Sequence, residues 1–140
     1  MQSRLNPYIF FRNQAREAIT FYKSVFGGEL TMQTYSEGKG SDNPKDADKL
    51  MHSQLEAPNG ITLMASDAPE GVEYNPGTNV SLSLSGEDEA ELRGYWDKLS
   101  QGANVTMPLN KAPWGDQFGM LTDKYGILWM VNIGAPKTKA

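Results

Sequence analysis

The sequence of 140 residues contains no cysteine and a single histidine. The absence of cysteine excludes disulfide bonds, thiolate nucleophiles and every zinc site that needs a cysteine ligand. A Ser-His-Asp triad could form only around His52, and no G-x-S-x-G motif is present to position a serine. The common hydrolase mechanisms therefore have little support.

Basic stripes and long apolar segments are also missing. The chain has 13 Lys and Arg against 17 Asp and Glu, which gives a net charge of −4, and no basic stripe could follow a phosphate backbone. No apolar run reaches the length of about 18 residues that suggests a membrane span, and no signal-like segment is present. We expect a cytoplasmic protein without nucleic-acid or membrane partners.

The sequence does contain an internal repeat. "GGELTM" at 27–32 and "GANVTM" at 102–107 each follow an amphipathic helical pattern, and each is followed by a second shared block. The second blocks are "LEAPNGITLM" at 55–64 and "LTDKYGILWM" at 121–130, which agree at Leu, Gly, Ile and Met. The first copy is longer because the charged segment 36–49 has no counterpart. Two copies of one structural unit explain this order.

Each copy predicts a strand, a helix and three further strands. The first strands are expected at 6–11 and 79–85, and the helices at 13–26 and 86–101 with Asn13 and Ser85 as N-caps. The apolar helical faces consist of Ala15, Ala18, Ile19, Tyr22, Val25 and Phe26, and of Leu92, Tyr95, Trp96 and Leu99. The sequence thus predicts an α+β fold with two βαβββ modules, about 4–66 and 78–134, related by a pseudo-twofold axis and sharing one curved mixed sheet in a single domain.

Several phrases resemble the PhnB-like branch of the vicinal oxygen chelate superfamily, which includes glyoxalase I, bleomycin-resistance proteins and extradiol dioxygenases. They are "YIFFRNQAREAITFYKSVFGGEL" (8–30), "MHSQL" (51–55), "NVSLSLSG" (79–86), "VTMPL" (105–109) and "WGDQFGMLTDKYGILWMVN" (114–132). The resemblance implies a cleft inside the curved sheet, helices on its convex face and a homodimer. It does not set the activity, because one fold hosts many functions.

In the metal enzymes of this superfamily, four ligands come from the first and last strands of each module. Those positions correspond to Pro7, Met64, Asn79 and Met130. Proline offers no side-chain donor, and thioethers are poor ligands for Zn, Ni, Mn or Fe(II). We therefore expect no metal and no cofactor, and a small-molecule-binding protein is the first hypothesis.

Strand alternation predicts which residues face the cleft. In 79–85 the leucines should pack under the helices, and Leu55 should do the same in its own strand, so the intervening polar residues face the other way. The predicted ligand-binding residues are His52, Gln54, Met64, Asn79, Ser81, Ser83, Trp114, Phe118, Met120 and Met130. The methionines could instead fill the core. Because no Arg or Lys occupies these strand positions, an uncharged or aromatic ligand fits best.

Two enzyme hypotheses stay open beside the binding protein. A metal-dependent isomerase, lyase or oxygenase could use a relocated site around His52, Gln54 and Glu56. A metal-free enzyme could use His52 as a general base. A methyltransferase is disfavoured, since "EGKG" within 36–49 does not open a helix as a cofactor-binding glycine loop should. We interpret 36–49 as a mobile, solvated lid or rim.

Overall fold

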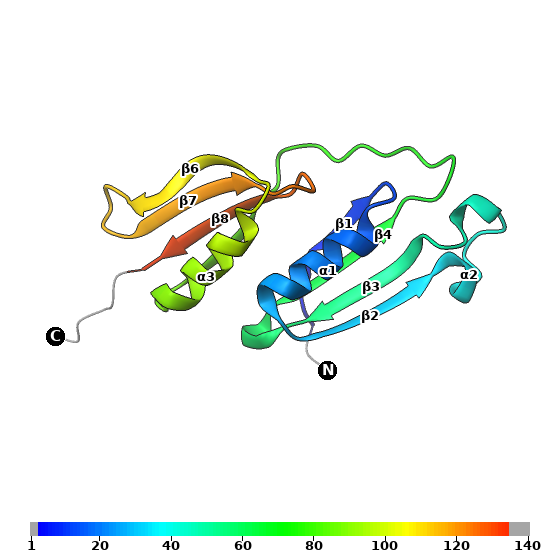
Figure 1. Cartoon of the computed structure of the whole chain (residues 1–140), viewed down its shortest axis with the longest axis horizontal. Helices are drawn as coiled ribbons and strands as arrows, with labels where there is room; N and C mark the ends of the chain where they lie inside the picture. Colours follow the sequence, from blue (N-terminus) through cyan, green and yellow to red (C-terminus); the bar gives the residue numbers. More distant parts are fainter. Residues whose placement is uncertain (1–2, 135–140) are drawn as a thin grey trace. The chain divides into compact units, whose positions relative to one another are not determined.

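The computed structural model describes residues 3–134, and the chain divides after Pro76 into two compact units. In the first unit (Figure 1), the elements are, in chain order, β1 (Tyr8–Phe11), α1 (Ala15–Phe26), β2 (Glu29–Thr34), α2 (Tyr35–Gly38), a 3-10 turn (Pro44–Asp46), β3 (Leu50–Glu56), a second 3-10 turn (Pro58–Gly60) and β4 (Thr62–Asp67).

The second unit repeats this order without the extra helical turns. Its elements are β5 (Leu82–Gly86), α3 (Glu89–Leu99), β6 (Asn104–Lys111), β7 (Gln117–Thr122) and β8 (Leu128–Ile133). The α+β class and the repeated βαβββ order are thus confirmed. None of the helices within residues 3–134 has the length and apolar content needed to cross a bilayer.

Both units build the same mixed sheet. The strand orders are β1-β4-β3-β2 and β5-β8-β7-β6, and in each sheet the first strand of the unit pairs in parallel with the last while the other pairs are antiparallel. The structure differs in one respect from the single sheet expected from the repeat, because the strand pairs form two four-stranded sheets. In each unit the first strand pairs with the last strand of the same unit, so each sheet consists of the strands of one unit.

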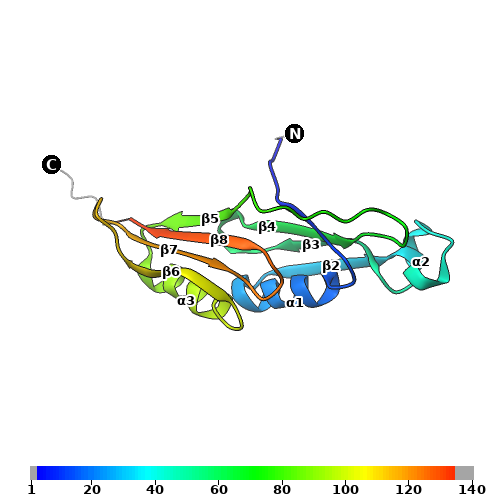
Figure 2. The ribbon, with the colours of Figure 1, turned by 90° about the horizontal axis from the view of Figure 1, so that it is seen from above.

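One helix packs on one face of each sheet, and these faces hold the core (Figure 2). All six residues predicted for the apolar face of α1 are buried. On α3, Leu92, Trp96 and Leu99 are buried, whereas Tyr95 is half-buried. The repeat partners Leu55 and Leu121 are both buried in their sheets, as the alternation predicted.

The two predicted N-caps are wrong. Asn13 lies before α1 with a φ of 70°, and the first helical amide, Ala15 N, donates instead to Asp67 Oδ1 of β4 at 2.9 Å. In α3 the cap is Asp88, whose carboxylate accepts from Glu91 N at 3.0 Å, so the helix begins later than Ser85 would have required. Sequence alone did not indicate Asp67, because this residue ends β4, which is far from α1 in the sequence.

The segment 36–49 is more structured than a solvated lid. Asp46 at the end of its 3-10 turn is 1% exposed, and its carboxylate accepts hydrogen bonds from Ser41 Oγ at 2.7 Å, Lys49 Nζ at 3.0 Å and Glu70 N at 2.9 Å. This one buried carboxylate therefore joins the segment to the chain that follows β4.

Candidate functional site

The face of the first sheet opposite α1 carries Tyr8, Phe10, His52, Gln54 and Met64, and is called here the Tyr8 face. The register places Tyr8 beside Met64 in the parallel pair and Gln54 beside Met64 in the antiparallel pair. Paired residues point to the same side of a sheet. The intervening Ser53 and Leu55 are fully buried on the α1 side.

Tyr8 and His52 form a direct contact in the middle of this face. The phenol oxygen of Tyr8 lies 3.2 Å from His52 Nδ1, and the two ring centroids are 5.7 Å apart. Phe10 continues the aromatic surface, with its ring centroid 5.2 Å from that of Tyr8 and its side chain 59% exposed. The contact orients the imidazole, because one of its two nitrogens is committed to the phenol.

The end of the Tyr8 face is an ion-paired cluster around Glu56. Arg4 Nη2 donates to Glu56 Oε1 at 3.1 Å, and Thr62 Oγ1 donates to Oε2 at 2.8 Å. Gln54 Nε2 also donates to Oε1. The hydrogen bond from Thr62, followed by those from Gln54 and Arg4, lowers the pKa of Glu56. Glu56 is therefore a charged, fully engaged carboxylate, a poor choice for proton transfer at neutral pH.

The corresponding face of the second sheet, opposite α3, holds four predicted site residues. The register places Met130 beside both Ser83 and Met120, and Phe118 beside Asn132. Trp114 is 61% exposed and meets Phe118 edge-on, with ring centroids 5.6 Å apart. Asn132 Nδ2 donates to Asp116 Oδ2 at 3.0 Å. This surface is apolar and aromatic, with neutral polar groups.

Asn79 and Ser81 are not strand residues. β5 begins at Leu82, and Asn79 lies exposed in the preceding segment. Met64 pairs with Tyr8 and its repeat partner Met130 pairs with Ser83, so Tyr8 and Ser83 hold the equivalent first-strand positions. Pro7 lies one residue before Tyr8 and Asn79 lies before β5, and the assignment of the superfamily ligand positions to Pro7 and Asn79 stays a prediction.

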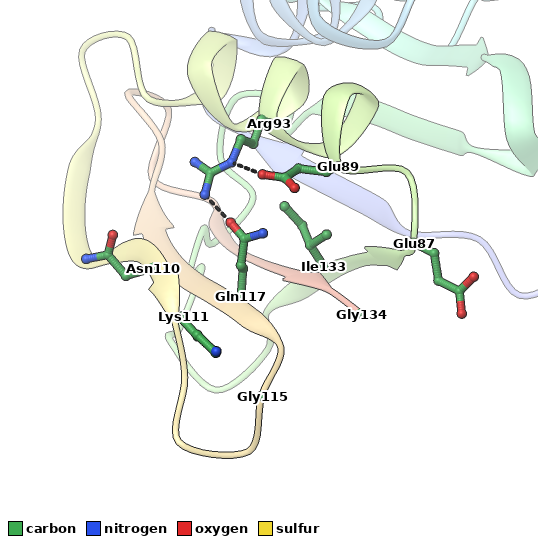
Figure 3. A pocket seen from close by; sticks show the side chains of 9 residues that line it. All are labelled: Glu87, Glu89, Arg93, Asn110, Lys111, Gly115, Gln117, Ile133 and Gly134. Carbon is green, nitrogen blue, oxygen red and sulfur yellow. Dashed lines mark hydrogen bonds and ion pairs between the residues drawn. The ribbon is translucent and has the colours of Figure 1, made fainter. Parts of the chain in front are cut away.

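The second unit also contains a cavity that no predicted ligand-binding residue lines. It has a volume of about 460 Å³ and is lined by Glu87, Glu89, Arg93, Asn110, Lys111, Gly115, Gln117, Ile133 and Gly134 (Figure 3). Sequence reasoning missed Arg93. The spacing of Glu89 and Arg93, one helical turn apart, was the available signal.

Comparison with known proteins now adds the family. The family model described as 3-demethylubiquinone-9 3-methyltransferase matches residues 3–132. The chain belongs to this family. Its members include PhnB-like proteins, and the PhnB-like resemblance of the sequence is thereby confirmed.

Similar proteins span nearly the full length of this PhnB-like chain. Protein YjdN of Escherichia coli is 28% identical, covering 92% of this chain and 94% of that protein. Protein Mb0911c of Mycobacterium bovis is 30% identical, covering 97% and 85%.

Several solved structures are similar in fold to this chain. Protein PA1353 from Pseudomonas aeruginosa has a TM-score of 0.83 at 34% identity and covers 96% of this chain and 100% of its own. A putative 3-demethylubiquinone-9 3-methyltransferase, PhnB protein, from Bacillus cereus has a TM-score of 0.73 at 27% identity, covering 94% and 100%. A glyoxylase/bleomycin resistance protein/dioxygenase domain from Frankia, at 16% identity, shares the fold with a TM-score of 0.65 and covers 96% and 98%.

The PhnB-like chain does not present the donors that the superfamily's metal enzymes use. The paired positions on first and last strands hold a phenol and a thioether (Tyr8, Met64) and a hydroxyl and a thioether (Ser83, Met130). Such donors do not fit Zn, Ni, Mn or Fe(II). Within residues 3–134, no three His, Cys, Asp or Glu side chains gather into a group that could hold a metal ion. No metal-dependent step follows from these residues.

Proposed function

We propose that this PhnB-like protein binds a small, uncharged, aromatic-containing molecule on the Tyr8 face, without a metal. The contact between Tyr8 and His52 carries the proposal. It combines an exposed aromatic surface with an imidazole whose orientation is held by a hydrogen bond. Stacking on Tyr8 and Phe10 would supply affinity, and the imidazole and the Gln54 amide would supply direction.

The charges around the Tyr8 face support an uncharged ligand. Arg4 is paired with Glu56 at one end of this face, so its guanidinium is already neutralised by a carboxylate. Capture of a dianion such as a phosphonate would need a free Arg or Lys in the middle of the face. Tyr8, Phe10, His52, Gln54 and Met64 supply none.

The single histidine gives a direct test. NMR signals of the His52 ring report the site without overlap, since the chain has one His. We expect 1-naphthol to shift these signals in a saturable way, and 1-naphthyl phosphate, which has the same ring and two added charges, to bind at least several-fold more weakly. Tyr8→Ala should abolish the effect of 1-naphthol, whereas Tyr125→Ala, in the other unit, should leave it unchanged.

Two results would refute this proposal. One is a His52 signal that does not respond to 1-naphthol. The other is a response that persists unchanged in Tyr8→Ala. Equal binding of the phosphate would contradict the preference for an uncharged ligand.

The metal-free enzyme is the second candidate, and the Tyr8–His52 contact favours it over the metal-dependent one. When Nδ1–H donates to the phenol oxygen, Nε2 carries a lone pair and can act as a general base. The relocated metal site around His52 is less well supported, because Glu56 already serves Arg4 and Thr62. His52→Gln would abolish turnover in a general-base enzyme while retaining part of the ligand binding.

The family description does not carry a methyltransferase activity to this chain. A glycine loop for the methyl donor should open a helix at its N-terminus. Here "EGKG" is followed, after Ser41 to Asn43, by a single 3-10 turn at Pro44–Asp46.

We also propose a homodimer. Sedimentation of the purified protein tests this, because it distinguishes the mass of one chain from that of two chains.

A further inference from the structure

The cavity of the second unit combines charges of both signs on different walls. Glu87 lies between β5 and α3, and Glu89 begins α3, so the acidic side chains come from one part of the unit. Lys111 ends β6 on the opposite wall (Figure 3). The buried Ile133 adds an apolar patch. The volume of about 460 Å³ is within the range of small-molecule sites.

Arg93 is held in place between these walls. Its Nε donates to Glu89 Oε2 at 3.0 Å, and its Nη2 donates to Gln117 Oε1. The hydrogen bond from Arg93, followed by one from Gln117, lowers the pKa of Glu89, so this pair is charged at neutral pH. A guanidinium has five N–H donors, and the contacts within residues 3–134 engage Nε and Nη2. Its Nη1 group can serve a ligand in a fixed orientation.

Neither Glu87 nor Lys111 has an ion-pair partner in the described part of the chain. The lining contains two carboxylates and two cations, so it offers no net attraction to a ligand of one sign. A simple anion would meet Glu87 and Glu89, and a simple cation would meet Arg93 and Lys111. A molecule that carries both charges, separated by a short chain, satisfies both walls.

We propose that this cavity binds a small zwitterion of the ω-amino-acid class, with its carboxylate at Lys111, where Nη1 of Arg93 adds a hydrogen bond, and its ammonium group at Glu87. The site lies in the second unit and does not depend on the Tyr8 face.

Three probes of equal chain length separate the charge requirements. 6-Aminohexanoate carries both charges, one at each end, whereas hexanoate carries only the carboxylate and hexylamine only the ammonium. We expect 6-aminohexanoate to shift the backbone amide signals of Gly115, Gln117 and Gly134, which line the cavity, and to bind at least about tenfold more tightly than either single-charge probe. The His52 ring signals should not respond to 6-aminohexanoate, so this result is independent of the test with 1-naphthol.

Single substitutions give the matched test. Lys111→Gln and Glu87→Gln should each weaken 6-aminohexanoate binding by about tenfold, because each removes one charged contact from an exposed side chain. Lys98→Gln, on α3 but outside the cavity, makes the same charge change as Lys111→Gln and should bind like the unmodified protein. The proposal is overturned by hexanoate or hexylamine binding as tightly as 6-aminohexanoate, by unchanged affinity in both variants, or by the absence of shifts at the lining amides.

Discussion

Asp67 is a single buried side chain at the end of β4 that joins three parts of the first unit. Its Oδ1 accepts from Ala15 N at the start of α1, and its Oδ2 accepts from Leu50 N at the start of β3, at 2.9 and 3.0 Å. Its backbone oxygen accepts from the Tyr35 hydroxyl at 2.7 Å. A buried carboxylate with two backbone donors is a strong local determinant of structure.

Replacement of Asp67 tests this role. Asp67→Ala leaves two backbone N–H groups without an acceptor and removes the cap of α1, so the free energy of unfolding should fall by about 3 kcal/mol. Urea denaturation followed by circular dichroism measures it. Asp42→Ala, at an exposed position of the same unit, should change stability by less than about 0.5 kcal/mol. A loss of that small size in Asp67→Ala would contradict the capping role.

At this scale, sequence predicted the apolar residues better than the polar ones. Periodicity alone identified the buried face of α1, because burial follows the helical repeat. The partners of Asp67 and the contact of Tyr8 with His52 depend on strand pairing between distant segments. No local pattern reports such pairing. The alternation in "PYIFF" places Tyr8 and Phe10 on one face of their strand, but it does not indicate which residues of other strands they meet.

Among the elements, the junction between α1 and β2 depends on two adjacent glycines with different demands. Gly27 and Gly28 have φ values of 76° and 96°. A Cβ on Gly28 would lie 2.1 Å from the backbone oxygen of Glu56, whereas a Cβ on Gly27 would have nothing within 4 Å. The sequence correctly placed the end of the helix here, but only the structure distinguishes the two positions.

Alanine substitution at Gly27 and at Gly28 separates the cost of a positive φ from the cost of a steric clash with the backbone of Glu56. Gly27→Ala should cost about 1 kcal/mol, which is the penalty for a non-glycine residue at positive φ. Gly28→Ala should cost several times more, since the backbone of β3 must also move. Thermal unfolding of the two variants measures the difference. Equal losses would show that β2 and β3 can separate at this end at little cost.

The segment 36–49 gives the first unit a dependence on pH. The hydrogen bond from Ser41, followed by those from Glu70 N and Lys49, lowers the pKa of Asp46 below its ordinary value, although desolvation opposes this effect. A carboxyl whose pKa is lower in the folded state stabilises that state above its unfolded pKa. This contribution is lost as the pH falls through the folded pKa.

Asp46→Asn should therefore be less stable than the unmodified protein at pH 7, and this difference should shrink below about pH 4. Urea unfolding between pH 2 and pH 7 measures both curves. Asp48→Asn, at an exposed neighbouring position, should run parallel to the unmodified protein throughout. A difference between Asp46→Asn and the unmodified protein that stays constant with pH would exclude Asp46 as the titrating group.

For the whole molecule, the repeat predicted the fold class and the order of elements, because two copies of one pattern provide two independent readings of each element. Hydrogen bonding into two four-stranded sheets was not predicted, since composition does not report which edges pair. The cavity of the second unit also went unpredicted. Its charged lining residues resemble any solvated surface in the sequence until the structure places them together.

The metal content of the purified protein is predicted from the side chains at the paired positions of the first and last strands. After exposure to Zn, Ni, Mn and Fe(II) followed by desalting, elemental analysis should find each metal well below one per chain. The reason is that Tyr8, Met64, Ser83 and Met130 offer no nitrogen or carboxylate ligand. A stoichiometric metal that is lost in His52→Ala would instead support the metal-dependent enzyme. A stoichiometric metal that is kept in His52→Ala would contradict both the metal-free protein and the metal site around His52.

The parallel pairing of first and last strands also determines the order in which the chain can fold during synthesis. β1 is synthesised first but has only β4 as a neighbour in the sheet. The backbone hydrogen bonds between β1 and β4, where Tyr8 pairs with Met64, can form only after β4 has been synthesised. Nearly all of the first unit must therefore leave the ribosome before its sheet is complete, and the same holds for β5 and β8 in the second. Until then the exposed apolar residues of β1, Tyr8 and Phe10, have no partner strand, which leaves this segment open to aggregation while the protein is being made.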